Sequence, residues 1–182
     1  MRRKGMFAAL VVAAAALAVA AYALAGGSGP GFNHLSATLS GYQETPSISS
    51  TGTADFTADV AKDGQSVDWH MSYSGLEGNV LQSHIHFGQR GVAGGISVFL
   101  CTNLGNGPAG TQACPGPHEG TISGTFGPSD VIGPTAQGIA AGEWNELVQA
   151  IVAGKAYANI HSNLWPAGEI RAQLNETGDP HD

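Results

Sequence analysis

The sequence predicts an all-β protein, an antiparallel sandwich or barrel of about eight strands with one short helix. Apolar and polar residues alternate along several short segments, which is the pattern of strands with one buried and one exposed face. Turn-forming Gly, Pro, Asn and Asp residues separate these segments. One segment in the second half of the chain instead has apolar residues three and four positions apart, which is typical of a helix packed on a core.

The N-terminal segment has the features of an export signal. It begins Met-Arg-Arg-Lys, continues as an apolar run over residues 7–25, and ends in Ala-Leu-Ala, a small-x-small cleavage pattern. The apolar run is also close to the roughly 20 residues that cross a bilayer. Residues 1–25 are therefore predicted to be a signal peptide or an N-terminal membrane anchor. Residues 26–33 form a flexible Gly-rich spacer, and the protein is expected to be secreted or extracytoplasmic.

The chain beyond this segment is strongly acidic. Three of the seven Lys and Arg residues lie in residues 1–25, which leaves four cations against 14 Asp and Glu residues. Binding to a nucleic-acid backbone depends on clustered Lys and Arg, so nucleic acid is excluded as a partner. Contact with a membrane is expected only through residues 7–25, if they are not cleaved.

The alternation is clearest in two consecutive segments. In residues 52–60 Ala and Phe alternate with Thr and Asp, and in residues 67–74 Val, Trp, Met and Tyr alternate with Asp, His and Ser. Lys62-Asp63-Gly64 supplies a turn between them, so the two segments are predicted to form a hairpin. The other predicted strands are residues 35–41, 80–87, 96–100, 120–126, 156–162 and 169–174.

The helix is predicted over residues 142–153. Its apolar residues follow the i, i+3, i+4, i+7 spacing of a single face: Trp144, Leu147, Val148 and Ile151. Gly154 stands where a C-terminal helix cap belongs. We expect this helix to pack over one end of the sandwich.

The chain has two cysteines, Cys101 and Cys114. Because an exported protein meets an oxidising compartment, a disulfide between them is the expected state. The alternative is a pair of thiolate metal ligands, which the absence of Cys-x-x-Cys spacing disfavours.

Three segments are more specific than the strand pattern. They are His84-Ile85-His86 followed by Gly88, Tyr157-x-Asn159-x-His161, and Gly168-Glu169-Ile170-Arg171. In this order, over residues 32–175, they resemble the CHRD domain, a family named for its occurrence in chordin and widespread in bacterial exported proteins. The resemblance implies an immunoglobulin-like β-barrel over residues 34–175, followed by a tail at 176–182. Most bacterial members of this family have no established biochemical activity, so the resemblance implies none for this chain.

Three histidines form the main candidate site. His84 and His86 are two residues apart on a predicted strand, so both imidazoles leave the same face, and His161 supplies a third from another strand. Such a set suits zinc or copper, with Glu169 as a carboxylate that ligates the ion or orients a ring. The alternative, which the sequence favours, is a structural network without an ion that pins the C-terminal hairpin.

Two further residues are expected to support this site. Glu44 follows the first strand, and its expected role is to accept hydrogen bonds from the backbone or from Arg171. A role for Glu44 as a direct metal ligand is the less favoured alternative. Glu169, Glu44 and Arg171 thus form the predicted second layer around the histidines.

The sequence favours a protein that is not an enzyme. Ser83 and His84 are neighbours on a strand and point to opposite faces, so they cannot form a nucleophile and base pair. We therefore expect an exported CHRD-domain protein with an interaction or structural role at the cell envelope, whose partner is an unknown protein or envelope component. The alternative is a small copper- or zinc-binding protein that uses His84, His86 and His161, in which case copper or zinc is the cofactor.

Overall fold

The computed structural model describes residues 33–176 and confirms the all-β prediction. Its strands are β1 (His34–Ser40), β2 (Thr53–Val60), β3 (Val67–Ser74), β4 (Val80–Phe87), β5 (Gly95–Thr102), β6 (Gly120–Phe126), β7 (Ala156–Ser162), β8 (Ile170–Gln173) and β9 (Asn175–Glu176). The α-helix is α1 (Trp144–Val152), and three 3-10 turns are η1 (Gly41–Gln43), η2 (Pro128–Asp130) and η3 (Thr135–Gln137). The predicted export segment at 1–25, the spacer up to residue 32 and the tail beyond residue 176 lie outside the described residues. Within the part described, no helix is long and apolar enough to cross a membrane.

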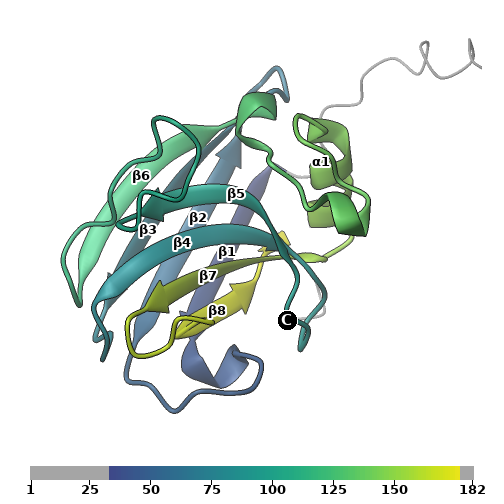
Figure 1. Ribbon diagram of the computed structural model, residues 1–182. Coiled ribbons are helices and arrows are strands. Elements are labelled where there is room, and N and C mark those ends of the chain that lie inside the picture. The colour runs from purple at the N-terminus through teal and green to yellow at the C-terminus, as the bar shows by residue number, and fades with distance from the viewer. Residues whose placement is uncertain (1–32, 177–182) are drawn as a thin grey trace, which may run out of the picture.

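The strands form one antiparallel sheet that is folded into two layers. They pair in the order β5-β4-β7-β8-β1-β2-β3-β6, and the short β9 pairs with β1. Figure 1 shows β5, β4, β7 and β8 as the front layer and β1, β2, β3 and β6 as the back layer. The result is a nearly closed barrel, with β5 and β6 as the two edges of the sheet.

The back layer follows the predicted alternation. Along β3 buried and exposed residues alternate without exception, and β2 buries Ala54, Phe56 and Ala58 on one face. The rings of Phe56 and Trp69 stack at a centroid distance of 6.3 Å inside the barrel. The apolar face of this hairpin therefore supplies one wall of the core, as period-two patterning requires.

The loop between β5 and β6 closes the gap between the two edges. Cys114 in this loop is disulfide-bonded to Cys101 on β5, at a Cα–Cα distance of 5.0 Å, which confirms the predicted bridge. The side-chain amide of Gln112 donates hydrogen bonds to the carbonyl oxygens of Leu100 on β5 (3.3 Å) and Ser123 on β6 (3.1 Å). One tethered loop thus satisfies backbone acceptors on both edges.

The helix is confirmed at nearly the predicted position. All four residues of its predicted apolar face are buried. The indole N–H of Trp144 donates to the carbonyl of Gly64 in the β2–β3 turn, which anchors the helix at one end of the barrel. Gly154 has a φ of +63°, and the N–H groups of Gly154 and Lys155 donate to Ile151 and Ala150, as in a Schellman cap.

Candidate metal centre

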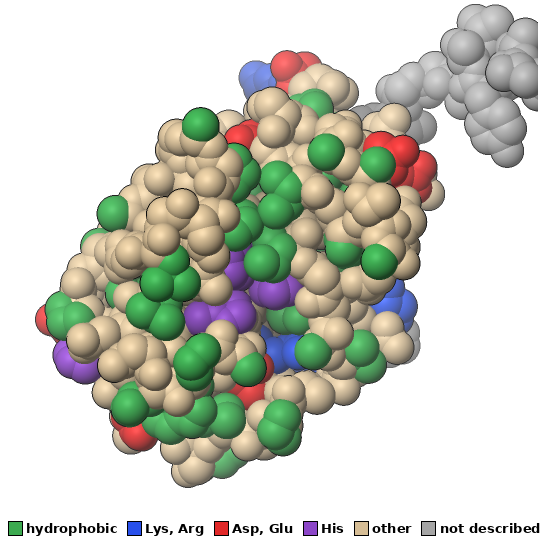
Figure 2. Space-filling view, viewed as in Figure 1, with side chains coloured by type: hydrophobic (Ala, Val, Ile, Leu, Met, Phe, Trp, Pro, Cys, Tyr) green, Lys and Arg blue, Asp and Glu red, His purple; other side chains and the backbone are tan. Residues whose placement is uncertain are grey.

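The three histidines of the predicted site lie together on the front layer, outside the barrel core. Ile85 of β4 points into the core, so its neighbours His84 and His86 point to the outer face of the layer. His161 lies on β7, which pairs directly with β4. Figure 2 shows histidine side chains, in purple, at the bottom of a hollow in the middle of this face. All three are nonetheless buried, with exposed fractions of 0%, 7% and 7%.

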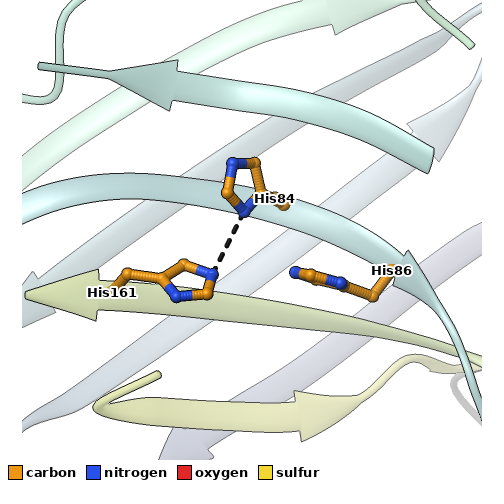
Figure 3. A group of neighbouring side chains, drawn as sticks. All are labelled: His84, His86 and His161. Carbon is orange, nitrogen blue, oxygen red and sulfur yellow. Dashed lines mark hydrogen bonds between the residues drawn. The ribbon is translucent and has the colours of Figure 1, made fainter. Parts of the chain in front are cut away.

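The three rings converge, and none points away from the other two (Figure 3). The Nδ1 atom of His84 lies 3.1 Å from the Nε2 atom of His161. One nitrogen from each ring can be chosen so that all three lie within 4.8 Å of one another. Ligands of a single zinc ion are about 3 to 4 Å apart, so the first pair already has this spacing and the His86 ring would have to move slightly inward.

Backbone carbonyls fix the protonation of two of these rings. Nδ1 of His86 lies 3.0 Å from the carbonyl oxygen of Gly94, and Nδ1 of His161 lies 2.9 Å from that of Pro166. A carbonyl oxygen only accepts, so both Nδ1 atoms carry the proton and donate. In a neutral ring Nε2 then carries no proton and has a free lone pair. The backbone thus turns the lone pairs of His86 and His161 toward the centre, as it does for histidine ligands of metals.

The third ring completes the set. Because Nε2 of His161 is an acceptor, Nδ1 of His84 donates to it in the absence of an ion. The Nε2 atoms of His84 and His86 are buried and have no hydrogen-bond partner among the described residues. A buried polar atom without a partner costs about 1–3 kcal/mol, so the cluster is not satisfied by hydrogen bonds alone.

All three rings are neutral at physiological pH. Burial lowers the pKa of His84 to about 2, with a further contribution from the neighbouring His161 and His86. Burial likewise lowers the pKa of His86 to about 4 and lowers that of His161. Neutral imidazole is the form that binds metal ions, so the site is in its ligand form well below pH 6.5.

The loop between β4 and β5 covers one side of the cluster and holds His86. A Cβ on Gly94 would lie 1.8 Å from the carbonyl oxygen of Phe87, so only glycine brings this backbone so close to β4. The N–H of Gly94 donates to the hydroxyl of Tyr157 at 3.0 Å, and the Tyr157 ring stacks on His86 at 4.7 Å. His86 is thereby fixed both at its Nδ1 atom and on its face.

The expected role of Glu169 beside the histidines was wrong. Its carboxylate accepts hydrogen bonds from the Ser50 hydroxyl (2.7 Å), the Glu77 N–H (2.7 Å) and the Gly78 N–H (3.3 Å). It therefore ties the loop before β2 to the loop after β3. Its turn brings it near His161 in the sequence, but its side chain leaves toward a different loop, and the ring of His161 is oriented by Pro166 instead.

Glu44 and Arg171 contact Asn159 and Tyr157 of β7 rather than the histidines, and they do not bond to each other. The amide of Asn159 donates to the Glu44 carboxylate, and the Arg171 guanidinium donates to the carbonyl of Val92 at 3.1 Å. Arg171 also lies over the Tyr157 ring, 3.8 Å from its centroid. The order His86, Tyr157, Arg171 is therefore a stack that runs outward from the histidine cluster.

Sequence reasoning did not assign Tyr157 and Asn159 to the site. Both alternate with His161 on β7, so period two places the three side chains on one face, and this signal was present in the sequence. The carbonyls of Gly94 and Pro166 carry no such signal, because any residue type offers the same acceptor.

The fold and the cluster define the class of this protein: an all-β barrel domain with a buried set of three histidines on the outside of one layer. The family model of the CHRD domain matches residues 35–174, and the chain belongs to this family. No curated protein and no solved structure matches it.

Proposed function

We propose that this CHRD-domain protein binds one copper or zinc ion through His84, His86 and His161. The observation that carries the proposal is the direction of the lone pairs: two backbone carbonyls hold the Nδ1 protons of His86 and His161, so both Nε2 atoms face the same centre. Hydrogen bonding alone leaves the buried Nε2 atom of His86 without a partner among the described residues, and a metal ion would supply one.

His84 joins the set by moving one proton within its own ring. Without an ion its Nδ1 donates to His161; with an ion the proton sits on Nε2, and the Nδ1 lone pair becomes a ligand. Three imidazoles with one open position suit zinc and copper, the two ions that favour nitrogen ligands of this kind.

The proposed role is binding at the cell envelope rather than catalysis. Membership of the CHRD family supports a non-enzymatic domain. The sequence of residues 1–25 supports export, by cleavage or with a membrane anchor. The physiological partner we propose is therefore an envelope component that presents or receives the metal ion, or that contacts the protein in its metal-bound form.

Metal titration tests this function directly. The untagged protein is dialysed against a mild chelator, titrated with Cu²⁺ or Zn²⁺ by calorimetry, and checked by elemental analysis. We expect one ion per chain, lost in His86→Ala and retained in His70→Ala, which removes an exposed histidine of β3. Binding of neither ion, or equal binding in both variants, would reject the three-histidine site.

A further inference from the structure

A second site lies beyond the histidine cluster, on the far side of Tyr157. It is a cleft of about 280 Å³ between the η1 turn, the β4–β5 loop and β8. Its lining includes Tyr42, Glu44, Ser47, Arg90 and Arg171. The Tyr157 ring separates it from the cluster, since His86 stacks on one face of that ring and Arg171 on the other.

The cleft gathers positive charge in an acidic protein. Beyond residue 25 the chain has only four Lys and Arg residues against 14 Asp and Glu. Two of those four cations, Arg90 and Arg171, line this one cleft. Scattered surface cations would instead be spread over the molecule to pair with the many carboxylates.

Arg171 is buried without an ionic partner. It is 3% exposed, and no carboxylate oxygen among residues 33–174 lies within 4.0 Å of its guanidinium nitrogens. Its one hydrogen bond to a described residue, to the carbonyl of Val92, uses one of five N–H donors. A buried charge is stabilised only when it is paired, so this guanidinium has unused capacity for an anion.

The nearest carboxylate does not neutralise this charge fully. Burial raises the pKa of Glu44 to about 7, although Arg171 acts in the opposite direction. The positively charged residues that line the cleft with Glu44 are Arg171 on β8 and the exposed Arg90 in the β4–β5 loop. Near neutral pH a substantial fraction of the Glu44 side chains is therefore uncharged, and the cleft keeps a positive excess.

We infer that this cleft binds a small oxyanion, a carboxylate or a phosphate group. The planar guanidinium of Arg171 matches two oxygens of either group, and Arg90 adds a second charge at the mouth. Tyr42, which is 72% exposed, offers an aromatic face to the remainder of the ligand, and Ser47 stands at the rim with its hydroxyl already donated to the carbonyl of Tyr42 at 3.1 Å. The site is separate from the proposed metal ion and does not depend on it.

Anion titration of metal-free protein tests this inference. Inorganic phosphate and acetate are each titrated at constant low ionic strength, followed by amide chemical shifts or calorimetry. We expect saturable binding of at least one anion, with the shifts confined to the η1 turn, the β4–β5 loop and β8. The anion that binds with the higher affinity indicates whether the natural ligand is a phosphate or a carboxylate compound.

The variants are placed at exposed positions, because loss of the buried Arg171 would also disturb its stack on Tyr157. Ser47→Glu puts a negative charge at the rim and should weaken binding about tenfold or more, since like charges repel strongly in a cleft. Ser47→Gln is the matched uncharged control and should bind as wild type does. Arg90→Gln should weaken binding, whereas Lys155→Gln, at a cation that does not line the cleft, should not.

Two results would overturn the inference: no saturable binding of either anion at millimolar concentrations, or equal binding by Ser47→Glu and Ser47→Gln. The metal proposal is tested apart from it by repeating the titration with His86→Ala. Anion binding that survives in this variant, together with loss of metal binding, shows that the two sites are independent.

Discussion

The Nδ1 atom of His84 donates a hydrogen bond of 3.1 Å to the Nε2 atom of His161, across the pairing of β4 and β7. The two atoms joined by this bond are the same two that would bind a metal ion. The hydrogen-bonded network and the proposed metal site would therefore be two states of one set of side chains, with the ion in place of the hydrogen bond between them.

Acid should destabilise the protein through these histidines. The pKa of His84 in the native state is about 2 and that of His86 about 4, against 6.5 in the unfolded chain. Between pH 6.5 and 4 the unfolded state therefore binds protons that the native state does not. The free energy of unfolding should fall by about 1.4 kcal/mol per pH unit for each such proton.

Urea unfolding of metal-free protein between pH 7 and 4.5 measures this slope. His86→Phe keeps an aromatic ring against Tyr157. It should reduce the slope by about 1.4 kcal/mol per pH unit relative to wild type, which is the contribution of one proton. His70→Ala, which removes an exposed histidine of β3, is the control for the loss of one histidine. Equal slopes for wild type and His86→Phe would contradict the prediction.

Glu44 should have the opposite dependence on pH. Its pKa rises from 4.5 to about 7 on folding, so the native state binds the extra proton between these values. The stability that this gives is present below pH 4.5 and is lost as the pH rises through 7. Glu44→Gln should thus be more stable than wild type at pH 8, by up to about 3 kcal/mol, and equal to it near pH 4.5.

Thermal and urea unfolding at the two pH values test this prediction. Glu146→Gln, at an exposed position of α1, is the control for exchanging a carboxylate for an amide. A Glu44→Gln variant that is less stable than wild type at pH 8 would show that the carboxylate is ionised and stabilising in the native protein.

The alternation of apolar and polar residues predicted the strands well, because it indicates which face of each strand is buried. It failed to predict the burial of the histidines. The sequence His84-Ile85-His86 alternates polar and apolar residues, which by itself indicates exposed histidines on an outer face. His86 is buried because the β4–β5 loop lies against it, and His84 packs edge-to-face on Phe99 of β5 at 4.3 Å. The path of a Gly-rich loop depends on tertiary contacts such as that of Gly94 with β4.

The role of Glu169 shows the same limit. Its closeness to His161 in the sequence suggested a shared site, yet the side chain accepts two backbone N–H groups from residues 77 and 78. Those donors lie on a loop some 90 positions earlier in the chain. Sequence patterns identify which residues share a strand face, but they do not say which distant loop comes to meet a side chain.

Loss of the disulfide should destabilise the barrel where the β5–β6 loop joins its two edge strands, β5 and β6. The bridge closes a loop of 13 residues, for which the chain-entropy model gives about 3 kcal/mol. Replacing Cys101 and Cys114 by Ala should lower the free energy of unfolding by about this amount. Gln112→Ala, which removes only the two hydrogen bonds from this side chain to β5 and β6, should cost about 1–2 kcal/mol. Non-reduced mass spectrometry that finds two free thiols would contradict the bridge itself.

The helix should be needed for stability rather than for binding. Leu147 is fully buried, so Leu147→Asp places an unpaired charge in the core and should cost several kcal/mol, on the order of 3–5. Val152→Asp, on the same helix but 54% exposed, is the matched control and should cost no more than about 1 kcal/mol, the size of a carboxylate's interaction with a helix C-terminus. Equal melting of the two variants would show that the helix does not pack as described.

Metal binding should raise thermal stability, and the size of the effect should follow from affinity. An ion that binds only the native state adds RT ln(1 + [L]/Kd), which is about 2.7 kcal/mol when its free concentration is 100 times Kd. We expect wild type and His70→Ala to show this rise in Tm with Cu²⁺ or Zn²⁺, and His86→Ala to show none. Because the ring pKa values are lowered, the rise should persist at pH 5, where an exposed three-histidine site is protonated and loses its ion. A Tm that drops equally in His86→Ala with and without metal, with no rise in wild type, would leave the histidines as a structural network alone.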